Sequence, residues 1–392
     1  MTSGKPGPQG AAGADSAARA AILGEGSAGG RPIGVVGTGL IGTSIALAAA
    51  RLGHSVRGFD RDAGVLARAA DRAGLEPAGD IASCARDAWT VFVCTPVPSI
   101  AAVVVECLAA NPRALVTDAG SVKSQVMVEV ESRAGAGAAS SRFVGGHPMA
   151  GSERSGPENA SAAIFDGAAW ILTPADPASP SPQAHALAEW VRAVGARPVV
   201  MDAERHDRLV AMVSHLPQVV SSALMALAAR EHALDPDLLD LSAGGFRDLT
   251  RLAASSPPLW TDILRANRGA VVPALRRFME ALEEVQAALD ADDAEGVEAV
   301  LTEGRRARQA LSAKPQVRAG VAVFQVAIPD RPGVLAGLTG TLADGDVNIE
   351  DLQIVHSVEG GRGTAHLTVA ADRAEAAAAA LASQGFDPVR LA

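Results

Sequence analysis

The stretch IGVVGTGLIG, residues 33–42, decides the fold that this sequence predicts. Its apolar start predicts a buried strand, and its glycines follow the spacing GxGxxG. In that spacing the first glycine permits a tight turn, the second lets the backbone approach a diphosphate, and the third lets a helix pack on the strand. The whole turn is therefore expected to bind a dinucleotide through Gly37, Thr38, Gly39, Leu40, Ile41 and Gly42.

A second strand, SVRGFD, ends in Asp60. The carboxylate lies at about the twenty-residue distance from the glycine turn that is expected of a group binding the adenosine ribose hydroxyls. It would repel a ribose phosphate, so NAD is favoured over NADP. Arg61 keeps NADP open, because a guanidinium could stack on adenine or pair with a phosphate. The alternative is a glycine turn in a sheet that binds no nucleotide.

Further strands and helices alternate along the chain, with strands at 90–97 and 114–119 and helices from 100 and after 124. This alternation predicts a Rossmann-type, doubly wound parallel sheet within an α/β fold. Ligands of such sheets lie at the carboxyl ends of the strands, where Thr95, Pro96 and Ser121 are found. Ser121 could instead be only the N-cap of the next helix.

The segment GGHPMAGSE, ending at Glu153, is the predicted centre of the chemistry. Its glycines predict tight turns after a short strand, RFVGG, and it carries one imidazole, His147. Histidine is the side chain that takes up and returns protons near neutral pH. The segment should share a crevice with Ser121. The alternative is a surface loop whose histidine only caps a turn.

Composition excludes several classes of protein. The 392 residues carry a formal net charge of −10 without a basic block, which argues against nucleic acid and anionic membrane surfaces as partners. The uncharged stretches 32–50 and 88–105 are broken by glycine or proline, so they predict buried strand–helix pairs rather than membrane spans. Three cysteines, Cys84, Cys94 and Cys107, are predicted to be small core residues of a cytoplasmic protein.

The length predicts several domains. Residues 1–30 read as a disordered tail without a signal peptide, and residues 31–201 as the NAD-binding domain. Residues 202–313 show helical spacing broken by prolines, which predicts about four to six helices in a substrate and dimerisation domain. Residues 314–320 form a linker. Residues 321–392 show the order βαββαβ of a ferredoxin-like domain.

The combination GTGLIG, DAGSVK, GGHPMAGSE, VSHLPQ and GGFRDLTRLAASSPPLW resembles the prephenate/arogenate dehydrogenase family, over residues 31 to about 314. The resemblance implies oxidative decarboxylation of prephenate to 4-hydroxyphenylpyruvate with reduction of NAD, in tyrosine biosynthesis. It also implies that His147 accepts the hydroxyl proton, that Ser121 binds the same hydroxyl, and that no metal takes part. A general base contributes roughly a hundred- to ten-thousandfold in rate.

The same resemblance suggests five substrate-binding residues: Arg247, His215, Gln218, Glu153 and Ser152. Arg247 would bind a carboxylate with two parallel hydrogen bonds, although a salt bridge with Asp248 is the alternative. His215 could instead be a satisfied core histidine. Many family members have histidine where this chain has Gln218. A neutral side chain there favours prephenate over arogenate, while Glu153 could partner the ammonium of arogenate.

The family resemblance also implies a homodimer formed through the helices. The C-terminal sequence DRPGVLAGLTGTLADGDVNIEDLQI resembles an ACT domain, which implies that an amino acid, tyrosine as the pathway's end product, binds near Pro332, Gly333, Asn348 and Ile349. The alternative is a module that only extends the dimer interface.

Two other functions remain open. β-Hydroxyacid and 6-phosphogluconate dehydrogenases also have a Rossmann domain followed by helices, but they use a lysine of the helical part. Lys123, the only lysine between Lys5 and Lys314, lies in the nucleotide half instead. The second alternative is a catalytically silent regulator that responds to NAD and an amino acid, against which the joint presence of His147, Ser121 and Arg247 argues.

Overall fold

A computed structural model describes residues 30–312 except 136, 138–141, 152 and 153, then 321–329, 331–356 and 362–391. The chain divides into two compact units, Met1–Leu227 with Thr250–Arg277, and Ala228–Leu249 with Phe278–Ala392. Residues just after position 202 belong to the first unit, because they hydrogen-bond the sheet domain. Asp207, for example, accepts the backbone N–H of Lys123. The predicted tail and linker lie outside the described residues, except for Gly30.

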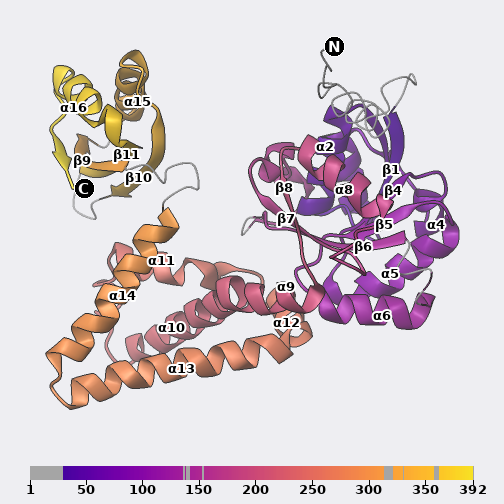
Figure 1. Ribbon diagram of the computed structural model, residues 1–392, viewed down its shortest axis with the longest axis horizontal. Helices are drawn as coiled ribbons and strands as arrows, with labels where there is room; N and C mark the ends of the chain where they lie inside the picture. Colours follow the sequence, from indigo (N-terminus) through magenta and orange to yellow (C-terminus); the bar gives the residue numbers. More distant parts are fainter. Residues whose placement is uncertain are drawn as a thin grey trace, which may run out of the picture. The chain divides into compact units, whose positions relative to one another are not determined.

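The first unit contains an eight-stranded sheet in the order β3-β2-β1-β4-β5-β6-β7-β8 (Figure 1). Its strands are β1 (Gly30–Val36), β2 (His54–Phe59), β3 (Glu76–Pro77), β4 (Thr90–Val93), β5 (Leu115–Asp118), β6 (Phe143–Pro148), β7 (Ala169–Thr173) and β8 (Arg197–Val200). The predicted Rossmann-type parallel sheet is confirmed from β3 to β6.

The last two strands correct the prediction of an entirely parallel sheet. β7 is antiparallel to β6, and β8 is parallel to β7. The chain returns after β6 through two short 3-10 helices, η1 (Pro157–Asn159) and η2 (Ala162–Phe165), instead of a crossover helix. A parallel pair needs such a crossover, so the neighbouring strand runs the other way.

Helices cover both faces of this sheet and create two apolar cores. One core lies beneath α2 (Leu40–Arg51), α3 (Ala63–Ala73) and α8 (Pro182–Ala193), and the other beneath α4 (Ile81–Ala85), α5 (Val97–Ala110) and α6 (Ser124–Ala134) (Figure 1). The uncharged stretch 32–50 forms β1 and α2, whose apolar residues are mostly buried. Burial of small and β-branched side chains on both faces explains why these segments lack charge.

The helical part contains six α-helices among the described residues, at the upper end of the predicted number. They are α9 (Ala203–Val210), α10 (Leu216–His232), α11 (Gly244–Thr250), α12 (Pro257–Ala266), α13 (Arg268–Asp290) and α14 (Ala294–Ser312). A π-helical segment, Ala211–His215, joins α9 to α10. The continuous stretch Ala203–His232 has the length and composition of a membrane-crossing helix. It also carries three buried, hydrogen-bonded polar side chains, His206, Asp207 and His215.

The C-terminal residues form a four-stranded antiparallel sheet in the order β10-β11-β9-β12. Its elements are β9 (Val321–Pro329), α15 (Val334–Asp344), β10 (Ile349–His356), β11 (Arg362–Ala370), α16 (Ala374–Ser383) and β12 (Pro388–Arg390). Alternate residues of β9 point into a core that includes Phe324, Leu338 and Leu367. The structure thus has the βαββαβ order, with the strand arrangement of a ferredoxin-like domain.

Candidate active site

The glycine turn between β1 and α2 has the shape that a dinucleotide requires. Gly37 has a φ of +90°, and a Cβ there would lie 2.7 Å from the Cys94 carbonyl oxygen. A Cβ on Gly42 would lie 1.9 Å from the Gly37 carbonyl oxygen, whereas one on Gly39 would meet nothing within 4 Å. No side chain caps the start of α2 at Gly39. Its first N–H groups are therefore available to a diphosphate.

Asp60 lies beside this turn at the end of β2. Its carboxylate accepts the Thr38 N–H at 2.8 Å and the Asp62 N–H at 3.0 Å, while the neighbouring Arg61 is exposed. At the end of β4, the buried Thr95 hydroxyl has no hydrogen-bond partner among the described residues, and Pro96 precedes α5. The fixed carboxylate, the unpartnered hydroxyl and the open Gly39 fit an adenine dinucleotide at the carboxyl ends of β1, β2 and β4.

His147 lies on strand β6 and not in the loop that its glycines predict. Gly145, Gly146 and His147 pair with β7, and His147 is only 9% exposed. The chain needs glycine at positions 145 and 146 because neighbouring atoms pack closely there, and not because the backbone makes a turn. A Cβ on Gly146 would lie 2.5 Å from the Asp118 carbonyl oxygen, and one on Gly145 would lie 2.3 Å from the Thr173 hydroxyl oxygen. This close packing fixes the histidine at the end of a rigid strand.

A cavity of about 430 Å³ joins His147 to Ser121, as the sequence predicts. Its wall consists of Ser121, His147, Pro148, Met149, Ala150, Gly151, Ser214, Gln218, Arg251, Leu252, Ser255, Leu259, Trp260 and Ile263. Ser121 is not the N-cap of α6, which begins at Ser124. The cavity combines an apolar wall with serine hydroxyls, an imidazole, an amide and a guanidinium, which suits a small ligand with an apolar body and an acid group.

Lys123 is fully buried and connects β5 to β6. Its ammonium forms an ion pair with the buried Asp118 carboxylate and donates to the Gly146 carbonyl oxygen at 2.7 Å. Asp118 also accepts the Gly146 N–H at 3.0 Å. Burial lowers the pKa of Lys123, and the charge of Asp118 opposes that shift. This lysine therefore supports the strand that carries His147.

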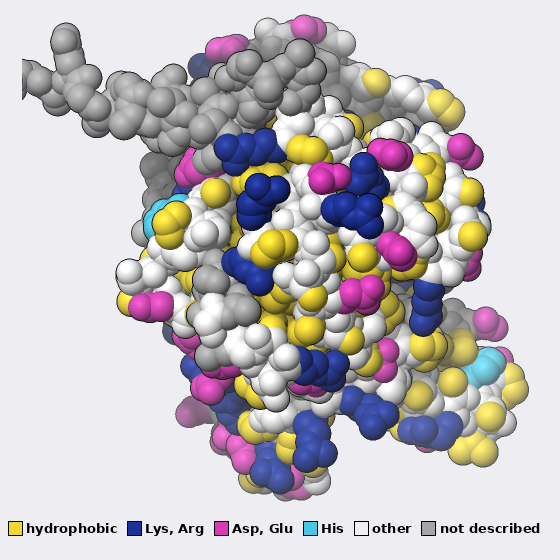
Figure 2. Space-filling model, turned by 90° about the vertical axis from the view of Figure 1, so that its right-hand side faces the viewer, with side chains coloured by type: hydrophobic (Ala, Val, Ile, Leu, Met, Phe, Trp, Pro, Cys, Tyr) yellow, Lys and Arg dark blue, Asp and Glu magenta, His cyan; other side chains and the backbone are white. Residues whose placement is uncertain are grey.

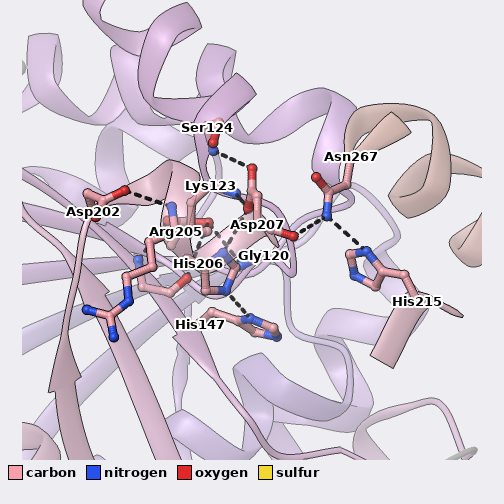
Figure 3. Close-up of polar contacts among 12 residues, drawn as sticks. Gly120, Lys123, Ser124, His147, Asp202, Arg205, His206, Asp207, His215 and Asn267 are labelled. Atoms are coloured by element: carbon pink, nitrogen blue, oxygen red, sulfur yellow. Dashed lines mark hydrogen bonds and ion pairs between the residues drawn. The ribbon is translucent and has the colours of Figure 1, made fainter. Parts of the chain in front are cut away.

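Sequence reasoning missed a second histidine and a carboxylate behind His147 (Figure 3). His147 Nδ1 lies 2.8 Å from His206 Nε2, and His206 Nδ1 lies 2.8 Å from Asp207 Oδ1. Burial, and then the nearby His206 and Lys123, hold the pKa of His147 well below its ordinary value. His147 is therefore neutral near neutral pH, as a general base must be. The adjacent pair His206 and Asp207, at the start of the helical part, was the sequence signal that could have revealed this network.

His215 is a buried histidine next to this network. Its Nδ1 lies 3.0 Å from the amide nitrogen of Asn267, which also donates to the Asp207 carbonyl oxygen at 2.9 Å. The ring packs edge-on against Trp260, and it is not among the residues of the cavity wall. Burial lowers the pKa of His215 to about 4, against the opposing charge of Asp207.

The lowered pKa of His215 predicts a pH-dependent stability. Between about pH 6.5 and pH 4 the unfolded chain binds more protons than the folded one, so stability falls as pH decreases through this window. For His215 the loss is on the order of 3 kcal/mol. Urea unfolding across this range should show the decrease, and His215→Asn should reduce its slope. Equal slopes for the two proteins would contradict the prediction.

Two arginines of the motif GGFRDLTRLA are placed differently. Arg251, at the start of the 3-10 helix η4 (Arg251–Ala254), lines the cavity. Arg247 is an exposed residue of α11 and belongs to the second compact unit. Gln218 is buried in the wall, where its amide nitrogen donates to the Leu252 carbonyl oxygen at 2.8 Å. Its Oε1 has no partner among the described residues.

Two of the predicted substrate-binding residues, Ser152 and Glu153, lie outside the described residues. Cys84 and Cys107 are buried and Cys94 is half-buried, and burial raises the pKa of Cys84 to about 11. Across the described ranges, no group of three His, Cys, Asp or Glu side chains could hold a metal ion. On the face drawn in Figure 2, basic and acidic side chains are interspersed.

A separate cavity of about 990 Å³ lies in the C-terminal domain. Pro332 and Gly333 line it together with Arg331 and Phe386, and Gly333 has a φ of +89° at the start of α15. Asn348 and Ile349 are not part of its wall; the Asn348 amide donates to the Glu350 carboxylate at 2.7 Å.

Comparison with known proteins agrees with this geometry. Residues 45–200 match the family described as prephenate dehydrogenase, nucleotide-binding domain, and residues 202–303 match prephenate dehydrogenase, dimerization domain. The prephenate dehydrogenase of Bacillus subtilis is 31% identical over 86% of this chain and 92% of its own length.

Two solved structures are similar in fold. Prephenate dehydrogenase from A. aeolicus, in complex with hydroxyphenyl propionate and NAD+, is 29% identical, with a TM-score of 0.66 over 73% of this chain and 99% of its own. Synechocystis arogenate dehydrogenase is 28% identical, with a TM-score of 0.62 over 71% of this chain and 99% of its own.

The Rossmann-type sheet, its glycine turn and the histidine cavity therefore define an NAD-dependent dehydrogenase. Within that class, the chain belongs to the prephenate dehydrogenase family.

Proposed function

We propose that this protein is a prephenate dehydrogenase, which oxidatively decarboxylates prephenate to 4-hydroxyphenylpyruvate. The observation that carries the proposal is the shared cavity of His147, Ser121 and Arg251. A neutral imidazole, a hydroxyl and a guanidinium are the groups needed for a substrate with a secondary alcohol and carboxylates. The nicotinamide of NAD, when bound, supplies the hydride acceptor.

The protein's own residues handle the hydroxyl proton and the charge of the substrate. His147 takes the proton of the ring hydroxyl while the carbinol carbon loses its hydride, and Ser121 donates to the same oxygen. The ring carboxylate leaves as carbon dioxide, and its electron pair makes the ring aromatic. The proton then returns to the phenolic oxygen. No covalent bond to the protein is needed, because aromatisation provides the remaining driving force.

Substrate identity can be tested by the absorbance of reduced cofactor. Prephenate or arogenate is offered with NAD or NADP, with and without tyrosine. Reduction with prephenate and NAD is the expected result, since the Asp60 carboxylate lies beside the glycine turn and would repel a ribose phosphate. Turnover of neither substrate would favour the alternative, a silent regulator that responds to NAD and an amino acid.

One observation favours arogenate as a second candidate substrate. The buried Gln218 Oε1 is an acceptor without a partner among the described residues, and a buried acceptor is stabilised by a donor. The ammonium of arogenate is a donor, whereas the ketone of prephenate is not. More efficient turnover of arogenate at matched concentrations would make this the preferred substrate, and Glu153 would then be a second residue to test.

Arg251 is proposed to bind a substrate carboxylate, in place of the predicted Arg247. A hydrogen bond to a charged group contributes roughly 1.5–3 kcal/mol, so Arg251→Ala should lower kcat/KM by about tenfold or more. Arg247→Ala should have a smaller effect, because Arg251 is the one of the two that belongs to the unit holding the cavity. Steady-state kinetics of the two variants decide between them. The reverse order of effects would restore Arg247 as the anchor.

The C-terminal domain is proposed to act as an ACT domain that binds tyrosine and inhibits turnover. Its cavity contains Pro332, Gly333 and Arg331, and a guanidinium can bind the carboxylate of an amino acid. A chain that ends at residue 314 should keep turnover and lose inhibition by tyrosine. Unchanged inhibition would place the effector site elsewhere, leaving this domain to extend a dimer interface.

The protein is also proposed to form a homodimer in the cytoplasm. Large apolar side chains of α13 and α14 are exposed, among them Met279, Leu282, Leu289 and Leu301. Such surfaces are usually covered by a partner. The second family match, described as a dimerization domain, spans these helices up to residue 303. A monomer mass by light scattering at micromolar concentration would remove this proposal.

A further inference from the structure

The catalytic imidazole proposed above is one end of a buried chain of three titratable side chains (Figure 3). His147 Nδ1 lies 2.8 Å from His206 Nε2, and His206 Nδ1 lies 2.8 Å from Asp207 Oδ1. His206 and Asp207 are 1% and 4% exposed, and neither lines the cavity. Their nearest link to the cavity is the hydrogen bond between His206 and His147.

Asp207 is held as an ionised carboxylate. Lys123 N–H donates to its Oδ1 and Ser124 N–H to its Oδ2, both at 2.8 Å, at the start of α6. Burial alone would raise the pKa of Asp207, but the hydrogen bonds from His206 and from these two N–H groups outweigh it and hold the pKa below its ordinary value. The positive end of the α6 dipole favours the same charge state.

This carboxylate determines where the protons of both rings lie. An ionised carboxylate only accepts hydrogen bonds, so the nitrogen of His206 that faces it, Nδ1, carries a proton. In neutral His206 the other nitrogen, Nε2, is then an acceptor. The His147 Nδ1 that faces Nε2 must donate. His147 Nε2 is thus left without a proton, which is the form that a general base requires.

We propose that His206 and Asp207 are positioning residues of the reaction, which fix His147 in the form with an unprotonated Nε2 and share the positive charge that His147 gains. This inference rests on the proposed function. When the substrate hydroxyl proton reaches His147 Nε2, the Nδ1 proton can move to His206 Nε2. The charge then lies beside the Asp207 carboxylate, which stays ionised, and the steps reverse as the proton returns to the product oxygen.

The surroundings of His147 explain why such support is needed. Its ring is buried and lies near the buried ammonium of Lys123, both of which disfavour a positive charge on it. A general base that cannot hold a proton is a poor one. The shared charge is compensated by Asp207, which is itself fixed by α6 and, through its carbonyl oxygen, by Asn267.

The test uses two substitutions of His206 in the full-length chain. In His206→Leu no acceptor faces His147, while in His206→Gln an amide oxygen can still accept the Nδ1 proton but cannot be protonated. We expect kcat to fall by about 10- to 100-fold in His206→Leu, as for other residues that orient a functional group, and by a smaller factor in His206→Gln. KM and NAD affinity should stay near the parent values, because His206 does not line the cavity.

The pH profile distinguishes positioning from a general loss of structure. The acid limb of kcat reports the protonation of the general base His147, and the hydrogen-bond partner of its Nδ1 changes in His206→Gln, so this limb should shift. His54→Leu is the matched control, since His54 is also a buried histidine of this unit but bonds the Arg31 carbonyl oxygen. It should leave the profile unchanged.

The outcomes separate this inference from the proposed function. A parent-like kcat and pH profile in folded His206→Gln, in a protein that loses activity on His147→Asn, would overturn the inference and leave the proposed function intact. If His206→Leu does not fold, the kcat and the pH profile of His206→Gln still test the inference. A parent protein that turns over neither prephenate nor arogenate would overturn the proposed function, and the inference with it.

Discussion

We expect His147→Asn to lower kcat by roughly a hundred- to ten-thousandfold, the usual contribution of a general base. Asparagine retains a polar group at the end of β6 but has no nitrogen that can take a proton near neutral pH. Because the glycine turn lies at β1 and α2, cofactor affinity should be unchanged. The measurements are steady-state turnover and NAD binding.

The control for this substitution is His185→Asn, because His185 is an exposed histidine of α8. It should retain parent activity. A His147→Asn protein as active as its parent would mean that another group accepts the hydroxyl proton, and the central assignment would be wrong.

The second large effect concerns stability. Lys123→Met should reduce the free energy of unfolding by about 3–5 kcal/mol, because it leaves the buried Asp118 carboxylate without its partner. The Gly146 carbonyl oxygen also loses its donor. Urea denaturation at neutral pH measures the change. Adding Asp118→Asn to Lys123→Met should recover part of the loss, since the unpaired charge is removed.

Arg133→Met is the matched control for a surface ion pair. Arg133 and Glu129 form an exposed pair on α6 with a nitrogen–oxygen distance of 3.1 Å. Such pairs contribute about 0–1 kcal/mol, so little change is expected. Equal losses in the two variants would show that the Lys123 pair has no special role in the fold.

The nucleotide half was predictable because its signals are local. The glycine spacing of residues 37–42 and the carboxylate Asp60 follow from one strand–helix–strand unit. The antiparallel β7 was not predictable, since nothing within its own sequence specifies the direction of its neighbour. The segment around His147 was misread as a loop because glycine suits both a turn and a close contact, and only the tertiary structure shows Asp118 and Thr173 beside Gly146 and Gly145.

The candidate site was predictable in part. Ser121 follows strand β5, and His147 lies near the end of the adjacent strand β6. Their shared cavity was therefore expected from topology alone. His206 is 59 residues from His147 along the chain, and no periodicity links the two. Arg247 and Arg251 lie one helical turn apart in the same motif. Residue type could not separate them, and only the structure shows that Arg251, on the 3-10 helix after α11, lines the cavity.

The π-helical segment Ala211–His215 makes the spacing of the site depend on a single residue. A π-turn contains one residue more than an α-turn, so a chain shorter by one residue here could continue as a regular α-helix. If the same residues formed a regular α-helix instead, every side chain after them would be rotated by about 100° relative to α9. Asp207 would still face α6, but Gln218 would leave the cavity. The orientation of Gln218 toward the cavity, relative to Asp207 on the preceding helix, thus depends on this one π-turn.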